Sequence, residues 1–298
     1  MIYHDMPFEE YLKLPGLNAS KLKPYSISPA RGLYKETKEF KRTMPMALGS
    51  IVHAHILEGQ QAAQELIDNH YITSGFPINE STGKPYGETS DKYKAWLSTQ
   101  DPRKEVIFPE VLNEKVKNIV DAVRNHREAS KMLAMANYRE TAISWVCKYT
   151  GEKCKAMIDY YGNNTAGDLK TFGKELTRSA IERELYDRQY HLQFAFYRDG
   201  LVANGVDIDE FNVIFVGTSN ENDVGPFIIN EDSLDKGRND YLKAIDNYNT
   251  AKKYDGGNIG LFPEVTEIGI PNYHLNREEE DYEEKLMIKQ MMGDLCEK

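Results

Sequence analysis

The chain has 298 residues, with 37 Lys and Arg against 47 Asp and Glu, so its formal net charge at pH 7 is −10. This balance excludes a protein that presents a broadly basic face to nucleic acid. Apolar residues make up 40% of the chain and 19 residues are tyrosines, which excludes a wholly disordered chain and is enough for one elaborated domain.

Residues 20–43 are the exception to the acidic balance. They include seven basic and two acidic residues, a net charge of +5. Gly and Pro interrupt this stretch, so we expect loops and short helices over an N-terminal segment of about residues 1–45. A basic segment of this kind is suited to contacting phosphates. The candidate contacts are Lys21, Lys23 and Arg31.

Helical patterns dominate the next part of the chain. Residues 46–69 are rich in helix formers and almost free of charge before Glu58, which predicts a helix buried on several faces. Residues 75–104 are polar and punctuated by Gly and Pro, as is typical of an excursion over the surface. Apolar residues then recur at helical spacing from 112 to 123, which predicts an amphipathic helix.

Strand patterns follow, and they begin with three short segments joined by tight turns. This arrangement predicts an antiparallel meander of residues 140–149, 153–161 and 166–172. The remaining predicted elements are a long helix at 176–198, strands at 211–219 and 224–230, a helix at 233–253, a short strand at 265–270 and a charged helix at 275–298. This order, without internal repeats, indicates an α/β (α+β) fold in a single domain spanning residues 1–298.

The turn at Asn163 and Asn164 brings two carboxylates together in the predicted meander. Asn accepts the positive φ of a two-residue type I′ turn, and such a turn places Asp159 opposite Asp168. Facing Cβ atoms lie about 4.5–5.5 Å apart, so the pair needs a compensating charge, for which a divalent cation is suited. Lys170 points to the same face because strand side chains alternate. This cluster is typical of metal-dependent phosphodiester hydrolysis; the alternative is an ordinary surface Asp–Lys pair.

Three other residues carry weaker signals. His53 lies one turn after Gly49 on a helix predicted to be buried, where a histidine is more often part of the core. Gln193 and Tyr197 are one turn apart in a stripe with Tyr186 and Tyr190, at spacings of 4, 3 and 4, that would ordinarily pack in the core. A buried amide needs hydrogen-bond partners, which a water or a phosphate can supply, so Gln193 stands out.

The order of the motifs is more specific than any one of them. The chain contains, in order, PGLNASKLK, SPARGLY, GSIVHAHILEG, IDYY, AGDLKT and QFAFY. Together they resemble the exonuclease VIII (RecE-like) family of phage and prophage nucleases, in the RecB-like branch of the PD-(D/E)xK superfamily. The resemblance covers about residues 5–271. One departure is Ile158, where this branch commonly has Pro.

The resemblance implies a fold and a metal site. The fold is a PD-(D/E)xK restriction-endonuclease-like core, in which helices flank a central mixed sheet that contains the antiparallel meander. Asp159 and Asp168 are expected to bind metal, and the Leu169 carbonyl and His53 to complete the metal shell. The expected ion is Mg²⁺, with Mn²⁺ able to substitute.

The resemblance also implies roles for residues around the metal. Lys170 is expected to be the catalytic lysine, and Gln193 and Tyr197 to position phosphate or water beside it. Glu58 and Glu140 are expected to support the site. Two serines of the N-terminal signature are expected either to contact the DNA end or to shape the loop around it; they are Ser20 and Ser28.

The activity that follows from the resemblance is exonucleolytic hydrolysis of double-stranded DNA ends, 5′→3′, in phage-type recombination. The family likeness further implies a single-strand annealing protein as partner and a ring-shaped trimer or tetramer. One alternative is another nuclease of the same superfamily, either an endonuclease or a single-strand-specific enzyme. A second alternative is a non-catalytic DNA-binding protein on the same fold.

Cysteine content and hydropathy bear on cofactors and location. The three cysteines are Cys147, Cys154 and Cys296, too few for a four-thiolate site, so no iron–sulfur cluster is expected. Cys147 and Cys154 flank a predicted hairpin, where we expect a reduced pair. The longest apolar run is Met132–Ala136, far below the ~20 residues of a membrane helix. We therefore expect a soluble, intracellular protein. The resemblance implies a cytoplasmic protein of a bacterial host cell, encoded by a phage or prophage.

Overall fold

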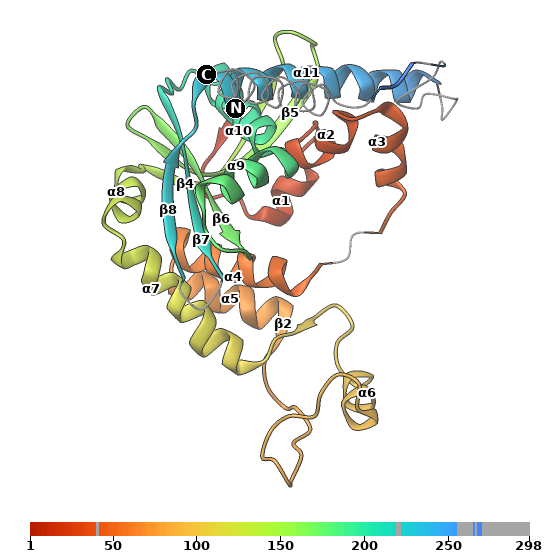
Figure 1. Ribbon diagram of the computed structural model, residues 1–298, viewed down its shortest axis with the longest axis vertical. Coiled ribbons are helices and arrows are strands. Elements are labelled where there is room, and N and C mark those ends of the chain that lie inside the picture. Colours follow the sequence, from red (N-terminus) through yellow and green to blue (C-terminus); the bar gives the residue numbers. More distant parts are fainter. Residues whose placement is uncertain (40–41, 219–221, 255–264, 266, 270–298) are drawn as a thin grey trace, which may run out of the picture. The chain divides into compact units, whose positions relative to one another are not determined.

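A computed structural model describes residues 1–39, 42–218, 222–254, 265 and 267–269 (Figure 1). The chain divides into two compact units, Met1–Ile259 and Gly260–Lys298, and every helix and strand described below belongs to the first. None of the helices among the described residues combines the length and the apolar character that crossing a membrane requires.

A six-stranded mixed sheet forms the centre of the first unit. Its strand order is β1-β4-β5-β6-β7-β8, and β6 and β7 are parallel whereas the other neighbours are antiparallel. The strands are β1 (Ile2–Tyr3), β4 (Tyr138–Val146), β5 (Lys153–Gly162), β6 (Thr165–Phe172), β7 (Glu210–Gly217) and β8 (Val224–Ile228). The predicted mixed sheet with an antiparallel meander is confirmed.

The hairpin between β5 and β6 has the predicted turn. Asn163 and Asn164 both have positive φ, 49° and 59°, as a type I′ turn requires. The pairing of β5 with β6 runs from Gly162–Thr165 to Tyr160–Gly167, which is the expected register. The pairing ends there, immediately before the two aspartates.

Among the described residues, five helices form the N-terminal part of the chain. They are α1 (Phe8–Lys13), α2 (Ala19–Tyr25), α3 (Pro29–Glu36), α4 (Met44–Leu57) and α5 (Gln60–His70). The prediction of one helix over 46–69 is wrong, because Gly59 has a φ of 102° and separates α4 from α5. The prediction of short helices and loops over residues 1–45 is confirmed.

The predicted surface excursion has structure of its own. Strands β2 (Tyr71–Ile72) and β3 (Glu105–Val106) pair in parallel, and α6 (Asp91–Leu97) lies between them in the chain. The predicted amphipathic helix is η1 (Val111–Val116), a π-helix, followed directly by α7 (Lys117–Asn125). Helix α8 (Arg127–Met135) then leads into β4.

The predicted helix over 176–198 is also two helices, α9 (Arg178–Asp187) and α10 (Tyr190–Ala203). Gln189 adopts a left-handed φ of 52° between them. Tyr186 is therefore 65% exposed, outside the stripe that continues from Tyr190 to Tyr197. The last described helix is α11 (Glu231–Tyr254).

Helices cover both faces of the sheet: Figure 1 shows α2, α10 and α11 on one side and α4, α5, α7 and α8 on the other. A hydrophobic cluster fills the space between the sheet and the helices on each side. Strand β7 shows why both faces are covered. Phe211, Val213 and Phe215 belong to one cluster, whereas Ile214 and Val216 belong to the other. Side chains alternate along a strand, so a continuous apolar run is buried on both sides.

Two predicted elements fall at the end of the chain. Residues 265 and 267–269 have no regular structure, and the rest of the predicted strand at 265–270 lies outside the described residues. The predicted charged helix at 275–298 also lies outside them, as does Cys296. The expectation of a single domain over the whole chain stays a prediction.

Candidate active site

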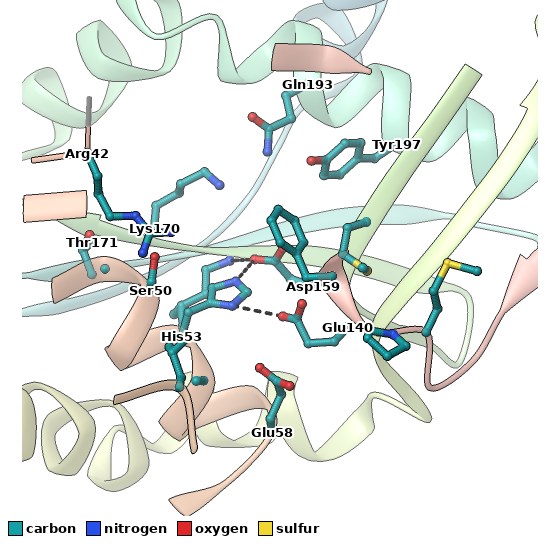
Figure 2. A pocket seen from close by; sticks show the side chains of 18 of the residues that line it. Arg42, Ser50, His53, Glu58, Glu140, Asp159, Lys170, Thr171, Gln193 and Tyr197 are labelled. Atoms are coloured by element: carbon teal, nitrogen blue, oxygen red, sulfur yellow. Dashed lines mark hydrogen bonds and ion pairs between the residues drawn. The ribbon is translucent and has the colours of Figure 1, made fainter. Parts of the chain in front are cut away.

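The residues singled out from the sequence surround one cavity of about 520 Å³ (Figure 2). They come from two helices and three consecutive strands, in segments between residues 44 and 203. The predicted residues in its wall are His53 and Glu58 near the end of α4, Glu140 on β4, Asp159 on β5, Leu169 and Lys170 on β6, and Gln193 and Tyr197 on α10. Asp168 lies immediately behind the wall and is fully buried.

Helix α4 reaches the sheet because of Gly49. A Cβ at this position would lie 3.0 Å from the Thr171 hydroxyl on β6, so the absence of a side chain permits the close approach. His53, one turn further along α4, then meets the carboxylates on the sheet. This contact gives the spacing from Gly49 to His53 a physical reason, which the sequence pattern alone could not supply.

His53 lies between two carboxylates. Its Nε2 is 2.7 Å from Asp159 Oδ2, and its Nδ1 is 3.0 Å from Glu140 Oε1. Burial alone would lower the pKa of His53, but the charges of Asp159 and Glu140 outweigh burial and raise it well above its ordinary value. The protonated imidazole therefore forms ion pairs with Asp159 and Glu140.

Glu140 has an unusual backbone. Its neighbours Arg139 and Thr141 pair with Tyr160 and Ile158, so Glu140 occupies the position opposite Asp159. Its φ is 43°, a left-handed conformation that is uncommon for a residue with a side chain. Such strain is found most often at functional sites, and here it accompanies the contact with His53.

Asp159 has three positively polarised neighbours. Besides the His53 ring, its Oδ2 accepts a hydrogen bond of 2.8 Å from the Leu169 backbone N–H, and Lys170 lies nearby. Burial would raise the pKa of Asp159, but His53, Lys170 and this hydrogen bond together lower it. The side chain is therefore held as a carboxylate.

Asp168 and Lys170 form a buried ion pair. Asp168 Oδ1 contacts Lys170 Nζ, and Asp168 Oδ2 accepts a hydrogen bond of 2.9 Å from Gln193 Nε2. Burial and the charge of Asp159 raise the pKa of Asp168 to about 6 against the opposing effect of Lys170. Burial would lower the pKa of Lys170, yet the two aspartates raise it above its usual range, so the side chain remains an ammonium.

Lys23 was predicted only as a basic residue of the N-terminal segment, and the structure places it beside the site. Its Nζ donates a hydrogen bond of 2.9 Å to Gln193 Oε1. Lys23 and Lys170 both face the Tyr190 ring, 4.9 and 5.2 Å from its centroid. Burial and the charge of Lys170 lower the pKa of Lys23 to about 7. No spacing along the sequence links residue 23 to residue 193.

The other candidate DNA contacts lie in different surroundings. Ser20 and Arg31 are exposed, and Lys21 is 3.2 Å from Glu36 in a surface ion pair. Ser28 is 5% exposed, and its hydroxyl accepts a hydrogen bond from the Arg31 backbone N–H at the start of α3. The Ser28 side chain is therefore a helix cap, and DNA contacts by the exposed residues stay a prediction.

The cavity also has residues that the sequence did not single out. Ser50 and Thr171 bring hydroxyls into its wall, and Arg42 brings a guanidinium whose Nη1 donates a hydrogen bond of 2.9 Å to the Tyr71 hydroxyl. Figure 2 shows Arg42, Ser50 and Thr171 together on the Lys170 side of the cavity. These groups give the cavity hydrogen-bond donors suited to an anion.

The donor set fits a divalent cation. One ligand atom each from His53, Glu140 and Asp159 lies within 4.8 Å of the others. Two carboxylate oxygens there are buried and lie against charged side chains, Glu140 Oε1 against His53 and Asp168 Oδ1 against Lys170. Buried carboxylates of this kind need a cationic partner, which a metal ion can also provide. The structure therefore adds Glu140 to the predicted ligands, whereas the roles of Asp168 and the Leu169 carbonyl stay predictions.

Comparison with known proteins agrees with this architecture. Residues 18–256 match the family described as "PDDEXK-like domain of unknown function (DUF3799)". No curated protein matches the chain. The fold is similar to a crystal structure of a "putative exonuclease" from Eubacterium rectale, with a TM-score of 0.58 and 12% identity, covering 91% of this chain and 98% of that one. The predicted superfamily is confirmed, and membership of the exonuclease VIII family stays a prediction.

Proposed function

Because the chain belongs to this PDDEXK-like family, whose match covers residues 18–256, we propose that it is a metal-dependent deoxyribonuclease. One observation carries the proposal. Asp159, Asp168 and Lys170 lie together on adjacent strands, with His53 paired to Asp159, around a cavity that is open to a substrate. Two buried carboxylates beside a buried ammonium are an expensive arrangement for stability alone.

His53, Glu140, Asp159 and Asp168 would hold the metal. A divalent cation bound there supplies positive charge beside a phosphodiester and makes water there more acidic. Lys170, which remains an ammonium, can donate to a non-bridging phosphate oxygen and stabilise the negative charge that develops during hydrolysis. Gln193 Nε2 and the Tyr197 hydroxyl can orient water or phosphate from the α10 side of the cavity.

The finer proposal is an exonuclease that acts on double-stranded DNA ends in the 5′→3′ direction during recombination. The motif resemblance to the exonuclease VIII family supports it, as it supports an annealing protein as partner and a ring-shaped oligomer. Arg42, Ser50 and Thr171 support an anionic substrate, because they line the same cavity with donors. Mg²⁺ is the proposed ion, and Mn²⁺ can substitute for it, because carboxylate oxygens suit both ions.

The proposal is tested by digestion of linear duplex DNA with Mg²⁺ or Mn²⁺. The wild-type protein is expected to degrade it, and Asp159→Asn and Lys170→Met to reduce the rate at least ~100-fold. Lys243→Met makes the same lysine substitution at an exposed position of α11 and is the matched control, expected to leave the rate unchanged.

Calorimetry with Mn²⁺ separates binding from chemistry. Asp159→Asn should lose metal affinity, whereas Lys170→Met should keep it and lose only cleavage. A protein that binds no divalent metal and degrades no DNA would instead be the non-catalytic DNA-binding alternative. Wild-type rates in both variants would show that the nuclease activity lies elsewhere.

A further inference from the structure

Lys23 is presented to the site by a rigid element. Leu22 and Tyr25, on either side of it in α2, are 0% and 1% exposed in the core under α10 and α11. The Tyr25 carbonyl accepts a hydrogen bond of 2.8 Å from Asn247 on α11, and the Ser26 hydroxyl bonds Gln189 at the start of α10. The Lys23 ammonium is thus held against α10 rather than free in solvent.

The surroundings of Lys23 do not offer it a counter-ion. Its hydrogen bond goes to the neutral amide of Gln193, and no carboxylate lies within ion-pair distance among the residues that the structure describes. Lys170, which faces the same Tyr190 ring, repels it. Placing a second cation there costs stability, so packing alone gives no reason for a lysine at this position.

The Gln193 amide lies between two groups of opposite character. Its oxygen accepts from Lys23 Nζ, whose ammonium form can only donate, and its NH₂ donates to Asp168, whose carboxylate form can only accept. The reverse amide orientation would set the oxygen against the carboxylate and the NH₂ against the ammonium. One orientation satisfies both neighbours, and the other satisfies neither.

We propose that Lys23 is a positioning residue, which fixes the Gln193 amide so that its NH₂ and not its oxygen faces the reacting groups. This inference rests on the proposed nuclease function. Asp168 alone could not maintain this orientation during catalysis, because a bound cation competes for the Asp168 oxygens and a substrate phosphate competes for the Gln193 NH₂. Lys23 binds the far end of the amide and keeps the donor directed into the site.

A double-mutant cycle tests this role. Lys23→Met, Gln193→Ala and the double variant are compared by single-turnover digestion of linear duplex DNA with Mg²⁺. Lys23→Met is expected to lower the maximal rate roughly tenfold or more. The protein concentration at which the rate is half-maximal should not change. In the Gln193→Ala background the same substitution should have almost no effect, because Lys23 acts through the amide.

Lys243→Met, the exposed lysine of α11, is the control for the substitution, and thermal unfolding checks that every variant is folded. Two results would overturn the inference. One is a full effect of Lys23→Met in the Gln193→Ala background. The other is an unchanged maximal rate that is reached only at a higher protein concentration, which would make Lys23 a direct DNA contact.

A second measurement needs no activity. The side-chain NH₂ signals of Gln193, identified by their loss in Gln193→Ala, are followed by NMR in the metal-free protein. Lys23→Met should move them toward the positions of a free amide and increase their exchange with water, and Lys243→Met should not. Unchanged signals would contradict the positioning role. If the wild-type protein failed to cleave DNA, the proposed function would be wrong while this measurement still decided the role of Lys23.

Discussion

At the scale of single residues, Glu140 differs most from its sequence-based interpretation. We expected only a supporting role, yet its left-handed backbone accompanies a side chain that faces His53 and contributes to the cluster with Asp159. Neither its spacing nor its residue type could show this, because the φ of one strand residue depends on the neighbouring strand. The Asp159, Asp168 and Lys170 cluster was predictable, since a turn and a period of two determine it.

Removing the charge of Glu140 should weaken metal binding. We expect Glu140→Gln to reduce Mn²⁺ affinity about 10–100-fold in calorimetry, the range typical of groups that support a metal site. Glu58→Gln makes the same change in the same cavity, outside the cluster with His53 and Asp159, and should have a smaller effect. Equal losses in the two variants would contradict a specific role for Glu140.

Cys154 gives a prediction that depends on pH. Burial, and then the nearby Cys147, raises the pKa of its thiol to about 12, so below this pH the side chain is the unreactive thiol rather than the thiolate. In a Cys296→Ser protein, a disulfide reagent at about pH 8 should label neither Cys147 nor Cys154 until the protein is unfolded. Stoichiometric labelling of the native protein would contradict the buried arrangement.

At the scale of elements, the two helix breaks show what sequence patterns can and cannot predict. The break at Gly59 is visible in retrospect, because glycine takes positive φ without strain. The break at Gln189 has no such signal. A contact from outside the helix stabilises it, because the Gln189 side chain accepts a hydrogen bond from the Ser26 hydroxyl. Tertiary contacts of this kind override local helix preference.

Close packing of α10 against α11 depends on Gly237. A Cβ at this position would lie 2.1 Å from the His191 carbonyl oxygen, which is backbone and cannot rotate away. Alanine is intrinsically the better helix former by about 1 kcal/mol. We nevertheless expect Gly237→Ala to lower Tm, because forcing the helices apart typically costs about 1–3 kcal/mol.

Lys243→Ala, at an exposed position of the same helix, is the control for this substitution and should leave Tm nearly unchanged. An increase in Tm for Gly237→Ala would mean that helix preference outweighs packing at this contact. Because α10 bears Gln193 and Tyr197, the same variant should also reduce cleavage.

At the scale of the whole molecule, a net charge of −10 remains compatible with DNA as substrate because charge is distributed locally. The carboxylates of the site lie against positively charged side chains. Arg42 and Lys170 line the cavity, and Lys23 lies beside it on Gln193. The antiparallel meander followed from short strand patterns and tight turns, and the mixed sheet between helices followed from the family resemblance. The short edge strand β1 and the parallel pairing of β6 with β7 were not predicted. The convergence of α2 on the site was not predicted either, because it joins residues 170 positions apart.

The central claim is that this cavity hydrolyses DNA from its ends with a bound metal. The most direct test is one reaction containing Mg²⁺, linear duplex labelled at either the 5′ or the 3′ end, and covalently closed circular DNA. We predict early release of the 5′ label, late release of the 3′ label and an intact circle. With Asp159→Asn, or with a chelator, we predict that neither label is released. Cleavage of the closed circle, or digestion that continues in Asp159→Asn, would contradict the account.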